Sequence, residues 1–404
     1  MNPTHSAKQA SIGLAALLLL VPTMIAAAPP EMSTYNTTFY TIHTDLSEED
    51  VREAALRVNR MAEEYARRTS DFSGKITERL PFYIFSNADD YYDAGGMPRS
   101  AGVYTGDRLM AISGKAYPSR WRILQHEGFH QFAHRVIGGR LPVWVNEGMA
   151  VYFEEAIFTG DNIVTGIVPA WRLRELQSMI RIGGHKPLLD MMSMPHLQWN
   201  HEFTSANYMQ AWSMVHFLVH GQNGNLLPRF EAFIRDVNIK ALTWEKAWQK
   251  NFGTDIHAFE KAWKEFWLDL PENAGMDKVA EAAVSTLTSF LGRAASQGQT
   301  FTDFSELNAR LHRYEGGDDP VWQAHSEDWL PPSLLSFALP YVNANGEWQL
   351  IGKGRSARIQ HKIPGKLVLQ GNFTVQGTRI RSVAVRSLPI RNAPGGFRQP
   401  TRRR

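Results

Sequence analysis

The 404-residue chain contains no cysteine. Its absence excludes disulfide bonds, thiolate ligands for a metal and the lipid-attachment site of a bacterial lipoprotein. The formal net charge is only +3, so the chain as a whole gives no reason to expect a nucleic-acid partner. Internal repeats are also absent from the sequence. Stability must therefore come from a buried core, and any bound metal must be held by nitrogen and oxygen atoms.

Apolar residues form one long run near the amino terminus, over residues 12–28, after a weakly basic segment that contains Lys8. Pro22 interrupts the run, which is shorter than the roughly 20 residues that a membrane-spanning helix needs. Small residues follow it, as signal-peptidase cleavage requires. We predict that residues 1–28 are a signal peptide and that the mature protein is periplasmic or secreted. An uncleaved membrane anchor is the alternative.

The first part of the mature chain alternates between strand and helix patterns. β-branched and aromatic residues predict strands over residues 37–44, 79–86 and 101–113, the last as two short strands around a Gly-Asp turn. Apolar residues at helical spacing predict a helix over 46–69, with Ser47 as its N-cap and Asp50 in the capping-box position. We therefore expect a small mixed sheet within residues 29–115.

The remaining chain divides into three regions by pattern. Residues 116–270 are predicted to be almost wholly helical, and a charged helical extension is expected over 271–330. Strand-like alternation then marks a β-rich region over 331–404, which begins with a proline-containing boundary. Taken together, these patterns predict an α+β protein.

The end of the β-rich region is strongly basic. The last 57 residues contain thirteen lysines and arginines and no acidic residue, and they end in Arg402, Arg403 and Arg404. Such a segment could bind an anionic envelope polymer or lipid. A solvated terminus without a partner is the alternative, and we expect no nucleic-acid partner.

The segment "LQHEGFHQFAH", residues 124–134, carries the clearest chemical signal. His126, Glu127 and His130 form the pattern H-E-x-x-H. On an α-helix, residues four apart lie on one face, so both imidazoles can reach the same Zn²⁺. Glu127 can then face the open coordination position and accept a proton from water. The pattern predicts a catalytic metal site if a third ligand is present.

Glu147 is the best candidate for that third ligand. Position 136, where a further histidine would be a ligand in the metzincin arrangement, is Val136. The first helix is expected to end at Gly138-Gly139, and a second helix begins near residue 142. At about 1.5 Å per residue, Glu147 returns in this hairpin to the level of His130. We predict one zinc ion held by His126, His130 and Glu147, with the fourth position open.

The motif "HEGFHQ…PVWVNEGMAVYFE" resembles that of the gluzincin metallopeptidases, in which H-E-x-x-H precedes a second helix with N-E or W-x-N-E-G-x-A. It is distantly similar to the M1 aminopeptidases, although the sixteen residues between His130 and Glu147 form a shorter gap than theirs. A closer resemblance is to the exported peptidase-MA-like proteins of the DUF1570 type. The resemblance covers about residues 37–270 and implies a zincin-like catalytic domain. It also implies that Tyr208, in "YMQAWSMVHFL", donates a hydrogen bond to the oxyanion, although the M1 residues after that tyrosine are absent.

Other residues near the motif have two interpretations each. Glu154 could hydrogen-bond a ligand histidine or be an ordinary solvated glutamate. His134 is expected in an outer position or on the surface. His216 is expected to be structural or exposed, although its place eight residues after Tyr208 could bring it near the site. Residues 101–106 could form an edge strand that binds an extended peptide, or an ordinary hairpin.

These observations favour an exported zinc metallopeptidase that acts on a peptide or protein substrate, with Glu127 as general base. A non-catalytic, zinc-stabilised envelope-binding protein and a zinc hydrolase of a non-peptide cell-wall amide are the alternatives. The sequence lacks the G-x-M-E-N segment with which M1 enzymes bind a free amino terminus, which favours endopeptidase action. The preferred side chains and the oligomeric state have no signature in the sequence.

Overall fold

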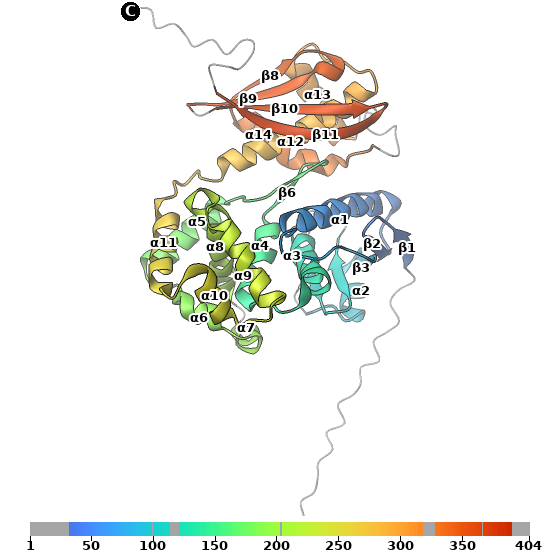
Figure 1. Ribbon diagram of the computed structural model, residues 1–404. Coiled ribbons are helices and arrows are strands. Elements are labelled where there is room, and N and C mark those ends of the chain that lie inside the picture. The colour runs from blue at the N-terminus through green and yellow to red at the C-terminus, as the bar shows by residue number, and fades with distance from the viewer. Residues whose placement is uncertain are drawn as a thin grey trace, which may run out of the picture.

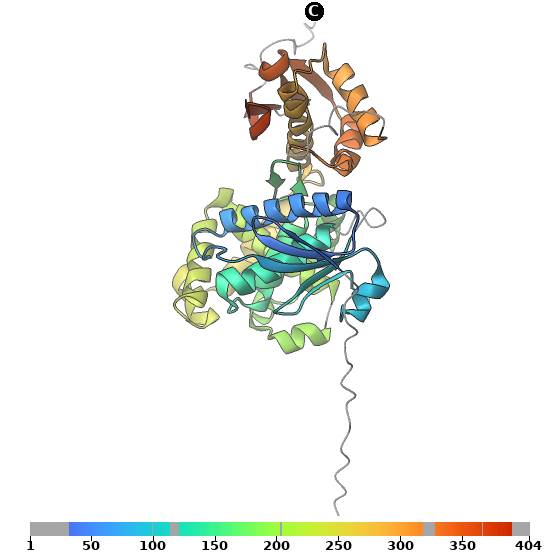
Figure 2. The same ribbon diagram turned by 90° about the vertical axis from the view of Figure 1, so that its right-hand side faces the viewer.

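The computed structural model describes residues 32–98, 100–113, 121–202, 204–317, 328–365 and 367–389. The predicted signal peptide and the basic end, including Arg402, Arg403 and Arg404, lie outside these ranges. Within them, no helix has the length and apolar character needed to cross a bilayer. The fold is of mixed α and β type, with one mixed sheet and one fully antiparallel sheet, which confirms the predicted fold class. The antiparallel sheet and its helices lie at one end of the molecule (Figures 1 and 2).

The amino-terminal sheet has five strands in the order β1-β2-β3-β5-β4. These strands are β1 (Ser33–Asn36), β2 (Tyr40–Thr44), β3 (Leu80–Phe85), β5 (Leu109–Ile112) and β4 (Gly102–Tyr104). The three central strands are parallel, whereas β1 and β4 pair antiparallel at the two edges. The predicted small mixed sheet is therefore confirmed, and the strand expected over 37–44 begins at Tyr40.

Helix α1 (Glu48–Arg68) covers one face of this sheet and begins at the predicted N-cap, Ser47. The Ser47 hydroxyl oxygen accepts a hydrogen bond from the Asp50 backbone N–H at 3.3 Å, and the same hydroxyl donates to the Asp50 carboxylate at 2.7 Å. Val51, Val58 and Met61 recur at helical spacing and are buried against the sheet. The short helix α2 (Ala88–Asp93) packs on the opposite face through Tyr91.

The central part of the chain is largely helical, as predicted. Its helices are α3 (Trp121–Phe132), α4 (Val143–Glu154), α5 (Ala170–Arg181), α6 (Leu188–Ser193), α7 (His196–Glu202), α8 (Ser205–His220), α9 (Leu227–Asn238), α10 (Trp244–Phe252) and α11 (Ile256–Asp269). A π-helical turn, η2 (Ala133–Gly138), extends α3, and a 3-10 turn, η3 (Gly221–Gly224), follows α8. One hairpin of two-residue strands, β6 (Ile157–Phe158) and β7 (Ile163–Val164), interrupts the helices and was not predicted.

The carboxy-terminal unit is built around α12 (Met276–Ser296), which packs across one face of an antiparallel sheet (Figure 1). The sheet order is β11-β10-β9-β8. Its strands are β8 (Glu347–Ile351), β9 (Arg358–Ile363), β10 (Leu367–Gln376) and β11 (Arg379–Leu388). The remaining elements are α13 (Phe304–Glu315), α14 (Leu335–Ala344) and the 3-10 turns η5 (Pro332–Leu334) and η6 (Gly354–Ser356).

One hydrophobic core joins the predicted helical extension and the predicted β-rich region. Phe290 of α12, Leu339 of α14 and Phe373 of β10 belong to the same buried cluster. The second half of α12 is almost completely buried, although the segment was expected to be a charged extension. Helix and sheet therefore fold as one unit across residue 330, because each covers the apolar face of the other.

The β6–β7 hairpin connects the two parts of the molecule. Phe158 of β6 belongs to the hydrophobic core of the carboxy-terminal unit. Asp161, at the tip of the hairpin, forms a buried ion pair with Arg293 of α12 at 2.7 Å, and Arg293 also pairs with Asp328 at 3.1 Å. The hairpin follows α4 directly, so this connection begins three residues after the helix that carries Glu147.

Candidate metal centre

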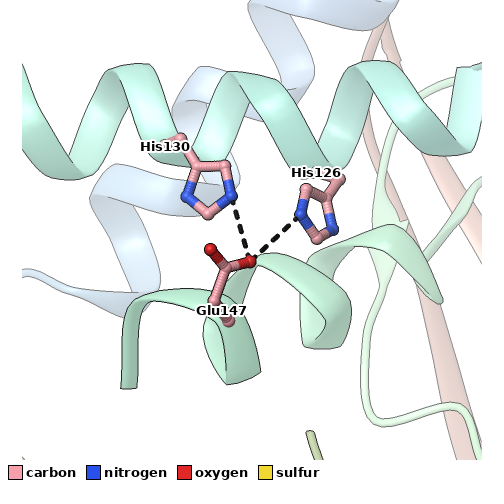
Figure 3. Close-up of side chains that lie close together, drawn as sticks. All are labelled: His126, His130 and Glu147. Atoms are coloured by element: carbon pink, nitrogen blue, oxygen red, sulfur yellow. Dashed lines mark ion pairs between the residues drawn. The ribbon is translucent and has the colours of Figure 1, made fainter. Parts of the chain in front are cut away.

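Helices α3 and α4 form the hairpin that the sequence predicts. The π-helical turn η2 ends α3, and Gly138 has a φ of +113°, a conformation that favours glycine. The chain then reverses, and α4 begins after Pro142, which lacks a backbone N–H to satisfy. Glu147 lies in the second turn of α4, opposite the face of α3 that carries His126 and His130 (Figure 3).

The three predicted ligands meet at one point. Oε2 of Glu147 lies 3.5 Å from Nε2 of His126 and 3.4 Å from Nε2 of His130. All three candidate ligand atoms lie within 4.8 Å of one another. Two atoms that each ligate an ion at about 2 Å lie within roughly 4 Å of each other. The triad is thus a candidate metal site made of two imidazoles and one carboxylate.

Opposing charges at this site shift the pKa of each member of the triad. Burial lowers the pKa of His126, but Glu147 and Glu154 raise it more, and the net result is a pKa of about 10. The pKa of His130 is also raised, because Glu147 outweighs the effect of burial. Burial raises the pKa of Glu147, yet the two histidines hold it well below its usual range. Without a metal, the ionised carboxylate is therefore balanced by positive charge on the histidines, which must release their protons when a metal binds.

Glu154 hydrogen-bonds the second nitrogen of His126. Oε2 of Glu154 lies 3.1 Å from Nδ1 of His126, which leaves Nε2 directed at Glu147. Arg122 lies 3.5 Å from the other oxygen of Glu154 and also pairs with Glu155. Such a carboxylate fixes the tautomer and the ring orientation of a ligand histidine. The first of the two interpretations of Glu154 is confirmed, and Arg122 is a supporting residue that the sequence did not reveal.

The edge strand β4 positions Glu127. The backbone N–H of Tyr104 donates a hydrogen bond of 3.0 Å to Oε2 of Glu127. This contact requires β4 to lie very close to α3, and glycine at 102 permits it. A Cβ atom at Gly102 would lie 2.7 Å from Cγ2 of Ile123 and 3.1 Å from Cγ of Glu127. Strand β4 lies at the edge of the sheet and forms a hairpin with β5, so peptide binding along it stays a prediction. Its link to Glu127 had no signal in the sequence.

Helix α8 brings Tyr208 to the same site. The ring centroid of Tyr208 lies 6.1 Å from that of His126, and burial together with the charge of Glu147 raises its pKa to about 12. Gly148, directly after Glu147, allows α4 and α8 to pack closely, because a Cβ there would lie 2.5 Å from the backbone oxygen of Ala211. The glycine of the W-x-N-E-G segment therefore has a packing role at this helix contact.

The remaining candidate histidines lie outside the triad. His134 is exposed, and its Nδ1 lies 2.8 Å from the hydroxyl of Tyr104. His216 is buried among the rings of Trp212, Trp267 and His220, which agrees with the expected structural role.

Two cavities flank the triad. One of about 350 Å³ lies on the side of His130 and Glu147 and reaches Tyr104, His134 and His196. The other, of about 340 Å³, lies on the side of His126 and includes Glu127 and Tyr208. A chain-like ligand could therefore place groups on both sides of the triad.

A family model described as a protein of unknown function, DUF1570, matches residues 122–238. The matched segment contains all three residues of the triad, as well as Glu127, Glu154 and Tyr208. No curated protein and no solved structure gives a significant match to the chain.

Proposed function

We propose that this protein is an exported zinc-dependent metallopeptidase of the gluzincin type. The observation that carries the proposal is the position of Glu127: its carboxylate is anchored by Tyr104 and lines a cavity beside His126. A metal site that only stabilises a fold needs its ligands alone and no such carboxylate.

The donor set fits zinc. The chain offers no thiolate, and two imidazoles with one carboxylate form the ligand set of many catalytic zinc sites. Two ligands at about 2.0–2.1 Å from a tetrahedral ion lie roughly 3.4 Å apart. The separations of Glu147 from His126 and His130 are 3.5 and 3.4 Å.

When bound, zinc supplies a Lewis acid that acidifies a water molecule and polarises the carbonyl group of the substrate. Glu127 accepts the proton of the attacking water and transfers it to the leaving amine. The hydroxyl of Tyr208 donates a hydrogen bond to the developing oxyanion, and its raised pKa keeps that proton in place at neutral pH. Glu154 holds His126 in the orientation that ligation requires.

The edge strand β4 supports a peptide as the substrate. Its outer side pairs with no other strand in the described part of the chain. An extended peptide can add to such an edge through backbone hydrogen bonds, although the N–H of Tyr104 already donates to Glu127. Cavities on both sides of the triad are consistent with a substrate that continues in both directions, which favours endopeptidase action.

The test is digestion of a mixed peptide library by the zinc-loaded mature protein, with cleavage products identified by mass spectrometry. Glu127→Gln is the matched control, since it removes the base and leaves the three ligands unchanged. Cleavage by the wild type alone supports the proposal. Glu147→Ala should lower the zinc content measured by elemental analysis, and unchanged content would exclude Glu147 as a ligand.

No cleavage by either protein, with zinc still bound, would contradict the proposal. A zinc-stabilised binding protein or a hydrolase of a non-peptide amide would then account for the site. Release of amine from cell-wall material by the wild type, but not by Glu127→Gln, would identify the second of these.

A further inference from the structure

The cavity beside His126 has a wall formed by helix α5. Trp171 and Glu175 lie one helical turn apart on this wall, and both are exposed. The apolar side chains of Ile123, Val151 and Met209 line the interior. The cavity thus combines an apolar interior with an aromatic ring and a carboxylate at its α5 side.

Most charged groups that line this cavity already have partners. Glu154 interacts with His126 and Arg122. The guanidinium of Arg172 makes two hydrogen bonds to Glu155, at 3.1 and 2.7 Å. Glu175, in contrast, makes no ion pair or side-chain hydrogen bond with any residue that the structure describes. Its negative charge is the one on this wall that a ligand could neutralise.

Trp171 is placed to contact a cation. Trp171 is 45% exposed, which is unusual for a tryptophan. The guanidinium carbon of Arg172 lies 4.7 Å from the ring centroid, so the ring is already within cation–π range of one positive charge. The exposed part of the ring remains accessible from the cavity.

We propose that this cavity selects a lysine or arginine side chain of the substrate, on one side of the scissile bond. The aliphatic stem would lie along Met209 and Trp171, and the charged end would reach Glu175. This inference rests on the proposed peptidase function and adds the substrate class to it.

The cavity on the other side of the triad differs in charge. Apart from the candidate ligand Glu147, its lining contains no carboxylate, and its other polar side chains are those of Tyr104, His130, His134, Asn146 and His196. A basic residue should therefore be preferred on one side of the cleaved bond only. A preference on both sides would not be explained by Glu175, which lies on one side only.

The experiment compares cleavage-site preferences in a peptide library for the wild type, Glu175→Gln, Glu175→Lys and Trp171→Leu. Glu245→Gln is the control, because Glu245 is an exposed carboxylate on α10 that lies outside both cavities. In the wild type, kcat/KM should be roughly tenfold higher for Lys or Arg than for Gln at the selected position. Glu175→Gln and Trp171→Leu should each reduce this ratio, and Glu175→Lys should shift the preference toward Asp or Glu.

Cleavage by the wild type without a one-sided basic preference, or with a preference that Glu175→Lys leaves unchanged, would overturn this inference but not the proposed function. A wild type that cleaves nothing would overturn the proposed function. In that case, binding decides the inference: dye-labelled peptides that differ only by a central Arg or Gln are titrated into zinc-loaded Glu127→Gln. The inference is supported if the Arg peptide binds more tightly than the Gln peptide and if adding Glu175→Lys to this protein abolishes the difference. Equal binding of the two peptides, or no binding, would overturn the inference.

Discussion

The backbone N–H of Tyr104 donates a 3.0 Å hydrogen bond to Oε2 of Glu127, which ties the edge strand β4 to the proposed general base. The same three-residue strand, Gly102–Tyr104, is the edge to which a peptide could add. Binding of a substrate along β4 and positioning of Glu127 are thus linked through one piece of backbone. Changes in β4 should affect catalysis more than they affect stability.

Gly102→Ala should separate β4 from α3. The new Cβ would lie 2.7 Å from Cγ2 of Ile123, so the strand or the side chain must move, at a cost of about 1–3 kcal/mol. We expect a loss of at least about tenfold in kcat/KM, because Glu127 would lose its fixed position. The double variant Gly102→Ala, Ile123→Ala removes the clashing carbon and should recover part of the activity. If the single and the double variant have the same kcat/KM, contact with Ile123 does not cause the loss of activity in Gly102→Ala.

Glu154→Ala should weaken zinc binding without removing a ligand. Loss of the carboxylate that hydrogen-bonds Nδ1 of His126 should lower the affinity about 10- to 100-fold. Competition with a chromophoric chelator measures this change. Glu154→Gln keeps an oxygen acceptor but loses the charge, so its affinity should lie between those of Glu154→Ala and the wild type. Equal affinities in all three proteins would exclude a role for Glu154 in orienting His126.

Asp161→Ala should destabilise the protein through the β6–β7 hairpin. Arg293 would lose its 2.7 Å partner in a buried environment but keep Asp328, so the cost should lie below the about 3–5 kcal/mol of a buried charge left without any partner. The attraction of Arg293 outweighs burial and lowers the pKa of Asp161, in agreement with a favourable pair. Urea unfolding measures the change. A similar loss is not expected for Glu63→Ala, whose ion pair with Arg60 is exposed, and equal losses would argue against a special role for the hairpin.

Acidification should destabilise the folded protein partly through His216. Burial is the main cause that lowers the pKa of His216, the nearby His220 adds to it, and the resulting pKa is about 3. Burial also lowers the pKa of His220, the positive charges of Arg68 and Lys278 add to the effect, and the resulting pKa is about 4. An unfolded histidine titrates near pH 6.5, so the unfolded state takes up protons first as the pH falls. Stability from these groups is complete above about pH 6.5 and is lost progressively down to the folded pKa values.

The matched variant for this prediction is His216→Gln, which cannot titrate. It should be less stable than the wild type at pH 8, because the aromatic packing changes. Between pH 6 and 4, the free energy of unfolding should fall less steeply with falling pH for this variant than for the wild type. The two slopes should differ by about 1.4 kcal/mol per pH unit, which is the contribution of one proton. The measurement is urea unfolding at a series of pH values. Parallel pH profiles for the two proteins would show that His216 does not contribute to the loss of stability at low pH.

The metal site was predictable because it depends on local spacing. Four residues on a helix place His126 and His130 on one face, and the Gly138-Gly139 reversal brings back Glu147 at the same level. The N-cap of α1 and the four predicted strand segments are local patterns too, and the structure confirms them. Contacts between distant segments, such as Tyr104 with Glu127, leave no periodic signal, so sequence patterns alone could not reveal them.

The parts of the fold that the sequence did not predict also depend on contacts between distant segments. Strands β6 and β7 have only two residues each, too few for an alternating pattern. Their place is set by the contacts of Phe158 and Asp161 with the carboxy-terminal unit. The first turns of α12 are charged, and they led to the prediction of a charged extension. The second half of the helix is rich in alanine, serine and threonine and is buried against β10. Small side chains carry a weak hydrophobic signal, yet they allow helix and sheet to approach closely.

The β6–β7 hairpin also has a consequence for the order in which the protein is made. Glu147 lies on the helix that leads into this hairpin, and the hairpin packs on residues that leave the ribosome much later, such as Arg293 and Leu330. Until these have emerged, Asp161 lacks its 2.7 Å partner, and Phe158 contacts Arg57 but lacks most of its apolar neighbours. We therefore expect the β6–β7 hairpin to reach its final packing only near the end of synthesis, later than the α3–α4 hairpin that carries the triad.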